Sequence, residues 1–144
     1  FPLIKRPMHE RNHPGQIALP GGAQENNEKL NYTAVREAFE EVGIKTETVE
    51  IIGQLTPLPV PVSGYLIYPF IGILEREPEW VLNEYEVDEL IITKVSELVS
   101  ADKNYSETWE LHGKKLEVPH FRIKDKVIWG ATASVLSEFI DLIH

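Results

Sequence analysis

The feature that most constrains this chain is an acidic helix end within the stretch GAQENNEKLNYTAVREAFEEVGI, residues 22–44. Three glutamates are spaced there at i, i+3 and i+4, so on a helix they share one face; they are Glu37, Glu40 and Glu41. They precede Gly43, a glycine placed to cap the carboxyl end of the helix. That end carries partial negative charge, and each carboxylate there costs about 0.3–1 kcal/mol.

Such an unfavourable arrangement of charge predicts a site that a cation neutralises. Oxygen ligands in a chain without cysteine favour a hard divalent ion, Mg²⁺ or Mn²⁺. The alternative is an acidic helix face that is simply solvated and binds no ion.

The spacing of the neighbouring residues favours the first interpretation. A glycine, a glutamate and the sequence REAFEEVGI occur at the spacing of the Nudix box, with matches at Gly22, Glu28, Arg36, Glu37, Glu40, Glu41 and Gly43. At roughly 7% usage per residue type, seven positions agree by chance on the order of once in 10⁸ placements. The segment therefore resembles the Nudix hydrolases.

The resemblance implies metal-dependent hydrolysis of a diphosphate linkage. Its charge shields such a linkage from water, and a divalent ion both neutralises that charge and lowers the pKa of bound water. The metal ligands implied are Glu37, Glu40 and Glu41, with the backbone carbonyl of Gly22. The fold implied is an α/β/α sandwich with a mixed sheet, as a single Nudix domain over residues 1–144. An earlier strand is expected to precede Phe1.

Other residues of the box are expected to support the carboxylates. Arg36 can lie beside Glu40 at i+4 and hold a carboxylate in place, which puts it in the predicted catalytic set. Gly21 and Gly22 allow a close approach of the backbone that a Cβ would obstruct. Glu28 is either an orienting residue or a solvated loop acid.

The segment before the box bears on the substrate. RPMHERNHPGQIALPGG, residues 6–22, is similar to the motif LLTXRSX3RX3GX3FPGG of the coenzyme A diphosphatase branch, although Pro2, Ile4, Pro7 and Leu19 depart from it. Arg6 and Arg11 match its arginines, and we expect both to bind a phosphorylated substrate together with Gly21 and Gly22. The alternative is that Arg6 merely ends a strand and Arg11 is a solvated cation.

A further carboxylate from outside the box often completes the Nudix site. Glu86 resembles the position that the coenzyme A branch uses, with Glu84 and Asp88 as rivals. The resemblance implies cleavage of coenzyme A or its thioesters into 3′,5′-ADP and 4′-phosphopantetheine or its acyl form. One alternative is hydrolysis of ADP-ribose or a nucleoside diphosphate sugar. Another is a Nudix-like ligand-binding domain without catalysis, although such domains typically lose carboxylates of the box.

Net charge and hydropathy exclude some classes of binding partner. The 144 residues carry a formal net charge of −9, which argues against nonspecific binding of nucleic acid or an anionic membrane. No apolar run approaches the length of a membrane span. We therefore expect a small-molecule diphosphate as partner and a cytoplasmic location, while a homodimer is left open.

Hydrophobic patterning and turn residues predict the elements. Helices are expected over 31–42, with Asn31 as N-cap and Phe39 on its apolar face, and over 132–143. Residues 56–62 read as a proline-rich loop, and Tyr68 and Phe70 as core residues. Strands or hairpins are expected over 16–19, 48–55, 65–74, 89–95 and 111–118. The apolar run 65–74 is expected to be buried, although Pro69 implies a sheet edge or a bulge within it.

Overall fold

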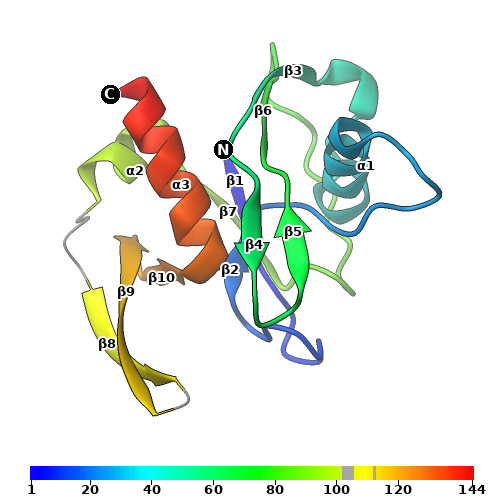
Figure 1. Cartoon of the computed structure of the whole chain (residues 1–144). Helices are drawn as coiled ribbons and strands as arrows, with labels where there is room; N and C mark the ends of the chain where they lie inside the picture. Colours follow the sequence, from blue (N-terminus) through cyan, green and yellow to red (C-terminus); the bar gives the residue numbers. More distant parts are fainter. Residues whose placement is uncertain (102–105, 112) are drawn as a thin grey trace.

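The computed structural model describes residues 1–101, 106–111 and 113–144, with mixed α/β content (Figure 1). Its helices are α1 (Leu30–Val42), α2 (Val95–Ser100) and α3 (Gly130–Ile143), with a short 3-10 helix, η1, over Thr46–Thr48. Its strands are β1 (Pro2–Lys5), β2 (Ile17–Ala18), β3 (Glu50–Gln54), β4 (Leu58–Val60), β5 (Tyr65–Ile67), β6 (Phe70–Ile73), β7 (Glu89–Ile92), β8 (Ser106–Leu111), β9 (Lys114–Ile123) and β10 (Lys126–Trp129). No helix within these described ranges is both long and apolar enough to span a bilayer.

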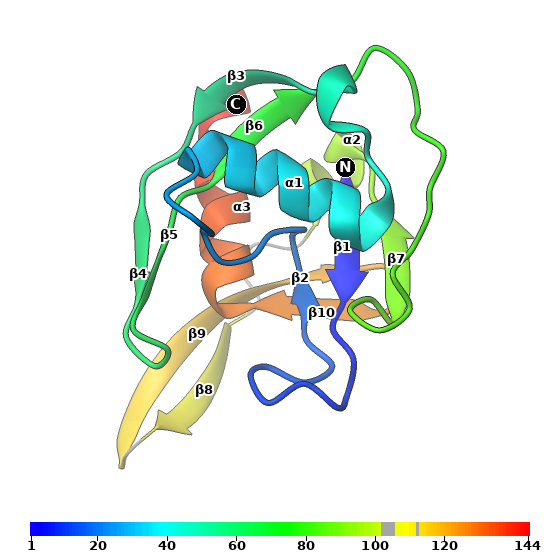
Figure 2. The ribbon, with the colours of Figure 1, turned by 90° about the vertical axis from the view of Figure 1, so that its right-hand side faces the viewer.

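Strand β1 is buried on both faces and lies between α3 and α1 in Figure 1, while α1 crosses in front of it in Figure 2. Successive side chains of a strand point to opposite faces, and Leu3 and Ile4 are each only 1% exposed. Leu3 belongs to a core cluster with Ile140 of α3, whereas Ile4 belongs to a second cluster with Val42 of α1. One short strand therefore connects the two hydrophobic cores.

The paired strands of the described residues form four small antiparallel sheets. Their orders are β2-β1-β7, β10-β9-β8, β3-β6 and β4-β5. The β8–β9 hairpin extends away from the other elements in Figure 1. Mixed α/β content is thus confirmed, while the α/β/α sandwich around one mixed sheet stays a prediction.

The buried strand predicted over 65–74 is wrong. Two short strands, β5 and β6, replace it, and they are separated at Tyr68 and Pro69 because a proline has no N–H to donate to a ladder. Tyr65 and Leu66 are 59% and 49% exposed, respectively. The proline-rich loop predicted over 56–62 also contains a strand, since β4 pairs with β5 around Pro59 in an isolated two-stranded sheet.

Several predicted boundaries shift. Helix α1 begins at Leu30, and Lys29 rather than Asn31 occupies the N-cap position. Asn31 instead accepts a hydrogen bond from the N–H of Tyr32 at 3.0 Å, within the first turn. Phe39 is 52% exposed, so the apolar face of α1 is narrower than predicted.

The remaining elements agree more closely with prediction. Helix α3 begins at Gly130, two residues before the predicted start, and η1 shortens the strand predicted over 48–55. The strand predicted over 89–95 ends at Ile92. The hairpin predicted around 111–118 is confirmed as β8–β9, with His112 outside the described residues.

Gly43 ends α1 as predicted. Its φ of 82° lies in the left-handed region, and its N–H bonds to carbonyls of the last turn. A Cβ at this position would lie 2.8 Å from the backbone nitrogen of Val81. The glycine therefore permits both the turn and the close passage of the chain that leads to β7.

Replacing Gly43 by alanine should destabilise the fold by about 1–3 kcal/mol, because the residue would be strained and would also clash. Gly64→Ala is the matched control, since Gly64 has a φ of 71° but open space around it. The free energies of unfolding of both variants, measured in urea, separate the backbone strain from the steric clash with Val81. Equal losses of stability in the two variants would contradict the close approach to Val81.

Candidate active site

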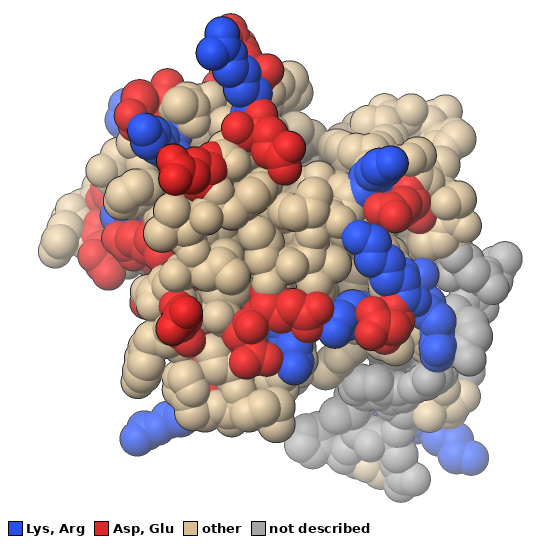
Figure 3. Space-filling model, turned by 180° about the vertical axis from the view of Figure 1, so that it is seen from behind, with Lys and Arg blue, Asp and Glu red and all other residues tan. Residues whose placement is uncertain are grey.

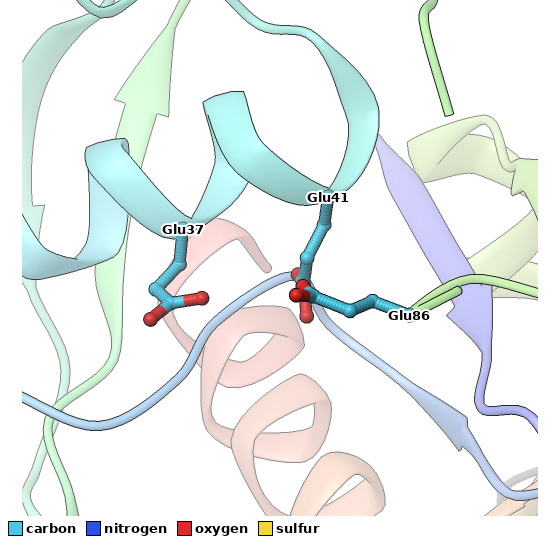
Figure 4. Close-up of side chains that lie close together, drawn as sticks. All are labelled: Glu37, Glu41 and Glu86. Carbon is cyan, nitrogen blue, oxygen red and sulfur yellow. The ribbon is translucent and has the colours of Figure 1, made fainter. Parts of the chain in front are cut away.

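Three carboxylates meet beside the last two turns of α1. Glu37 and Glu41 project from the helix and Glu86 from the loop between β6 and β7 (Figure 4). Each residue offers one carboxylate oxygen, and these oxygens all lie within 4.8 Å of one another. The structure thus brings Glu86, rather than its rivals Glu84 and Asp88, to the box glutamates. Asp88 instead pairs with Lys5 at 2.9 Å.

Backbone hydrogen bonds explain how Glu86 reaches this position. The last carbonyls of a helix lack partners within it, and here the chain at 81–83 supplies them. The N–H of Val81 donates to the carbonyl of Val42 at 3.1 Å, and the N–H of Asn83 donates to that of Glu41 at 3.0 Å. The N–H of Glu86 then donates to the carbonyl of Asn83 at 3.0 Å. The cap of α1 and the placement of Glu86 are therefore one arrangement.

Glu41 is the most buried of the three carboxylates, at 6% exposed. Burial, reinforced by the nearby charges of Glu37 and Glu86, raises its pKa to about 8. A hydrogen bond from the N–H of Gly21 at 2.9 Å and the charge of Arg6 act in the opposite direction and do not compensate. Without an additional cation, Glu41 is thus held mostly protonated at neutral pH.

Glu37 faces Gly22 at very close range. A Cβ built on Gly22 would collide with the carboxylate of Glu37, whereas a Cβ on Gly21 would have open space. The prediction that a Cβ would obstruct the backbone therefore holds at Gly22 and is wrong for Gly21. Gly21 instead donates its N–H to the carboxylate of Glu41. Burial raises the pKa of Glu37, while Arg36 partly opposes this shift.

Arg36 connects the box carboxylates. Its guanidinium donates to Glu28 at 2.7 Å, to Glu37 at 2.9 Å and to Glu40 at 3.1 Å. It also donates to the carbonyl of Ala23 at 3.1 Å. Hydrogen bonds from Arg36 hold the pKa of Glu28 at about 2, and the same contacts raise the pKa of Arg36. Glu28 is therefore an orienting partner of Arg36 and not a free loop acid.

The chemistry of the acidic group fits a divalent cation. All three side chains offer hard oxygen ligands, and the protonation of Glu41 reflects negative charge that the protein itself leaves uncompensated. Glu40 lies outside the group, with an exposed side chain bound to Arg36. Its predicted role as a metal ligand stays a prediction.

The two predicted substrate arginines lie in the connection between β1 and β2. Arg6 pairs with Glu10 and is close enough to Glu41 to lower its pKa. Arg11 is exposed, and its side chain forms no ion pair with the described residues. On the face shown in Figure 3, basic side chains lie interleaved with acidic ones.

An open groove beside the amino end of α1 is the feature that the sequence did not predict. Its volume is about 560 Å³, and its lining comprises Gln24, Asn27, Glu28, Lys29, Leu30, Asn31, Ile51, Gly53, Gln54, Tyr68 and Phe70. Tyr68 and Phe70 were predicted as core residues but are only partly buried here. The interruption expected at Pro69 is present between β5 and β6, whereas the burial expected for this segment is not.

Comparison with known proteins agrees with this arrangement. The model of the NUDIX domain matches residues 2–112. A protein of Enterobacter sp. (strain 638), named "Uncharacterized Nudix hydrolase NudL", is 35% identical over 137 residues, which cover 94% of this chain and 71% of the relative. Proteins with the same name from Pectobacterium atrosepticum and Photorhabdus laumondii are each 33% identical over 94% of this chain, covering 71% and 73% of their own lengths.

The box residues, the acidic group at the end of α1 and these matches lead to one conclusion. The chain belongs to the Nudix family, whose hydrolases act on diphosphate bonds.

Proposed function

We propose that this Nudix hydrolase cleaves the diphosphate of coenzyme A or its thioesters, releasing 3′,5′-ADP and 4′-phosphopantetheine or its acyl form. Water adds to one phosphorus, the bond from that phosphorus to the bridging oxygen breaks, and a carboxylate of the acidic group accepts a proton from the water. The observation that carries this proposal is the placement of Arg6 close to Glu41, on the loop whose sequence resembles the coenzyme A motif.

Glu37, Glu41 and Glu86 are the residues that would hold Mg²⁺ or Mn²⁺, with the carbonyl of Gly22 nearby. The bound ion would neutralise phosphate charge and acidify water. Arg36 keeps Glu37 and Glu40 in place through the hydrogen bonds described above. These positioning contacts exist before substrate arrives, so little reorganisation is needed during the reaction.

Two arginines suit a substrate with more phosphate than a simple diphosphate has. Coenzyme A carries a 3′-phosphate in addition to its diphosphate, and guanidinium groups bind phosphate in a bidentate manner. Arg11 is exposed and without an ion pair among the described residues, so it can take such a group. The intact box carboxylates argue against a binding domain that has lost catalysis.

We also infer that residues 1–144 form a single Nudix domain with the α/β/α sandwich that the family resemblance implies. The burial of β1 between a core on α1 and a core on α3 supports this arrangement.

Product analysis tests the substrate directly. Incubation of the protein with coenzyme A and Mg²⁺ or Mn²⁺ should release 3′,5′-ADP, identified by chromatography and mass spectrometry. The same assay with ADP-ribose and a nucleoside diphosphate sugar should show lower kcat/KM. A clear preference for ADP-ribose would reject coenzyme A as the substrate while leaving diphosphate hydrolysis intact.

Glu41→Gln should reduce kcat by roughly a hundredfold or more, because the variant lacks a carboxylate for the metal and for proton transfer. The fold should persist, since the amide oxygen still accepts the hydrogen bond from Gly21. Glu50→Gln, at an exposed position of β3, is the control and should retain full turnover. Near-normal turnover of Glu41→Gln would refute the assignment of this site.

The metal-free protein should lose stability as the pH rises from about 4.5 to about 8. In this window folded Glu41 retains a proton that the unfolded chain releases, since its folded pKa is about 8 against an ordinary value of 4.5. The folded state binds more protons there, so the free energy of unfolding falls with rising pH. The low pKa of Glu28 acts only between about pH 2 and 4.5, below the window.

Urea unfolding in the presence of EDTA at several pH values measures this effect. In Glu41→Gln, the free energy of unfolding should change less between about pH 4.5 and 8 than in the wild type. Saturating Mn²⁺, used in place of EDTA, should stabilise the wild type most near pH 8. A wild-type profile that rises with pH and is unchanged by the substitution would contradict the burial of an uncompensated carboxylate.

A further inference from the structure

We propose that coenzyme A lies along α1 in one defined direction: its phosphopantetheine arm occupies the groove beside the amino end of the helix, and its adenosine 3′,5′-diphosphate half lies toward the loop that carries Arg6 and Arg11. This inference rests on the proposed function and adds the orientation of the substrate.

The groove has the chemistry of the arm. Pantetheine has two amides, a hydroxyl and an apolar dimethyl carbon, and carries no charge. The lining combines amide side chains, those of Gln24, Asn27, Asn31 and Gln54, with the apolar or aromatic side chains of Leu30, Ile51, Tyr68 and Phe70. A volume of about 560 Å³ is in the usual range for a small-molecule site.

The charge of the groove is unsuited to the other half of the substrate. Its lining contains one acidic and one basic residue, Glu28 and Lys29, so it has no excess of positive charge. Glu28 is already bound to Arg36. A 3′-phosphate placed there would meet one cation, Lys29, with the acidic Glu28 beside it in the chain. The arginine loop, in contrast, offers Arg11 without a partner among the described residues.

The positions along the helix fit an extended substrate. Leu30 and Asn31 line the groove at the first turn of α1, and Glu37 and Glu41 follow toward its carboxyl end. At 1.5 Å per residue, Leu30 and Glu41 are about 16 Å apart along the axis. Arg6 acts on Glu41, at the end away from the groove. The acidic group thus lies between the two sites, where the diphosphate of a substrate that spans both would be placed.

Direct contact links the groove with the acidic group. Glu28 forms part of the groove wall, Arg36 donates to Glu28 at 2.7 Å, and Arg36 also donates to Glu37 at 2.9 Å. Arg36 therefore joins one wall residue of the groove to one carboxylate of the acidic group through two hydrogen bonds. Its open side also leaves room for an acyl group at the end of the arm.

The two reaction products are the probes that test this orientation. Their dissociation constants can be measured by calorimetry with Mg²⁺ for the wild type, Gln54→Trp and Arg11→Ala. Gln54→Trp narrows the groove and should raise the dissociation constant of 4′-phosphopantetheine by about tenfold or more. The dissociation constant of 3′,5′-ADP should stay within about twofold of the wild-type value. Arg11→Ala should show the opposite pattern, since it removes a charged partner of phosphate.

Matched variants keep the test independent of folding. Ile52→Trp places the same side chain on β3 at an exposed position outside the groove and should leave both affinities unchanged. Asn31→Trp narrows the groove from α1 instead of β3 and should reproduce the effect of Gln54→Trp. Thermal unfolding of each variant confirms that the protein is folded.

The outcomes separate the orientation from the function. If the wild type releases 3′,5′-ADP from coenzyme A but both groove variants bind 4′-phosphopantetheine normally, the orientation is wrong and the function stands. Selective loss of 3′,5′-ADP binding in the groove variants would reverse the orientation. If the wild type does not cleave coenzyme A, the proposed function fails, and the orientation of this substrate fails with it.

Discussion

Three carboxylates, those of Glu37, Glu41 and Glu86, meet at the negative end of a helix, where full ionisation would be unfavourable, so the surrounding structure must hold them together. The guanidinium of Arg36 donates to Glu37, and the N–H of Gly21 donates to Glu41. The chain at 81–86 caps the helix and delivers the third carboxylate. A divalent cation would therefore meet a group that folding has already assembled, and it would displace the proton that Glu41 holds at neutral pH.

The short strand β1 determines where this acidic helix end lies. Leu3 packs with the core that includes α3, and Ile4 packs with the core that includes α1. The chain leaves β1 directly into Arg6, and Asp88, two residues after Glu86, donates its N–H to the carbonyl of Lys5 at 2.9 Å. Both the arginine loop and the third carboxylate are therefore positioned by the same strand, which ties the proposed phosphate-binding and metal-binding groups to one rigid reference.

Features set by local chemistry were predictable from the sequence. The helix end at Gly43 follows from the backbone freedom of glycine, and the pairing of Arg36 with Glu40 follows from helical spacing. The position of Glu86 needed the family resemblance, because no local rule relates it to α1. The groove and the exposure of Phe39 and Tyr65 were missed, because hydrophobicity alone does not indicate which apolar side chains a distant part of the chain will cover.

Gly22 has a consequence for how such a protein can diverge. Its backbone conformation lies outside the left-handed region, so an alanine could be accommodated there by the chain itself, and only the carboxylate of Glu37 obstructs the added carbon. A single methyl group at this position would thus displace one carboxylate and spare both hydrophobic cores. Because Glu37 belongs to the acidic group, the site could be altered in a folded protein without a change in any charged residue.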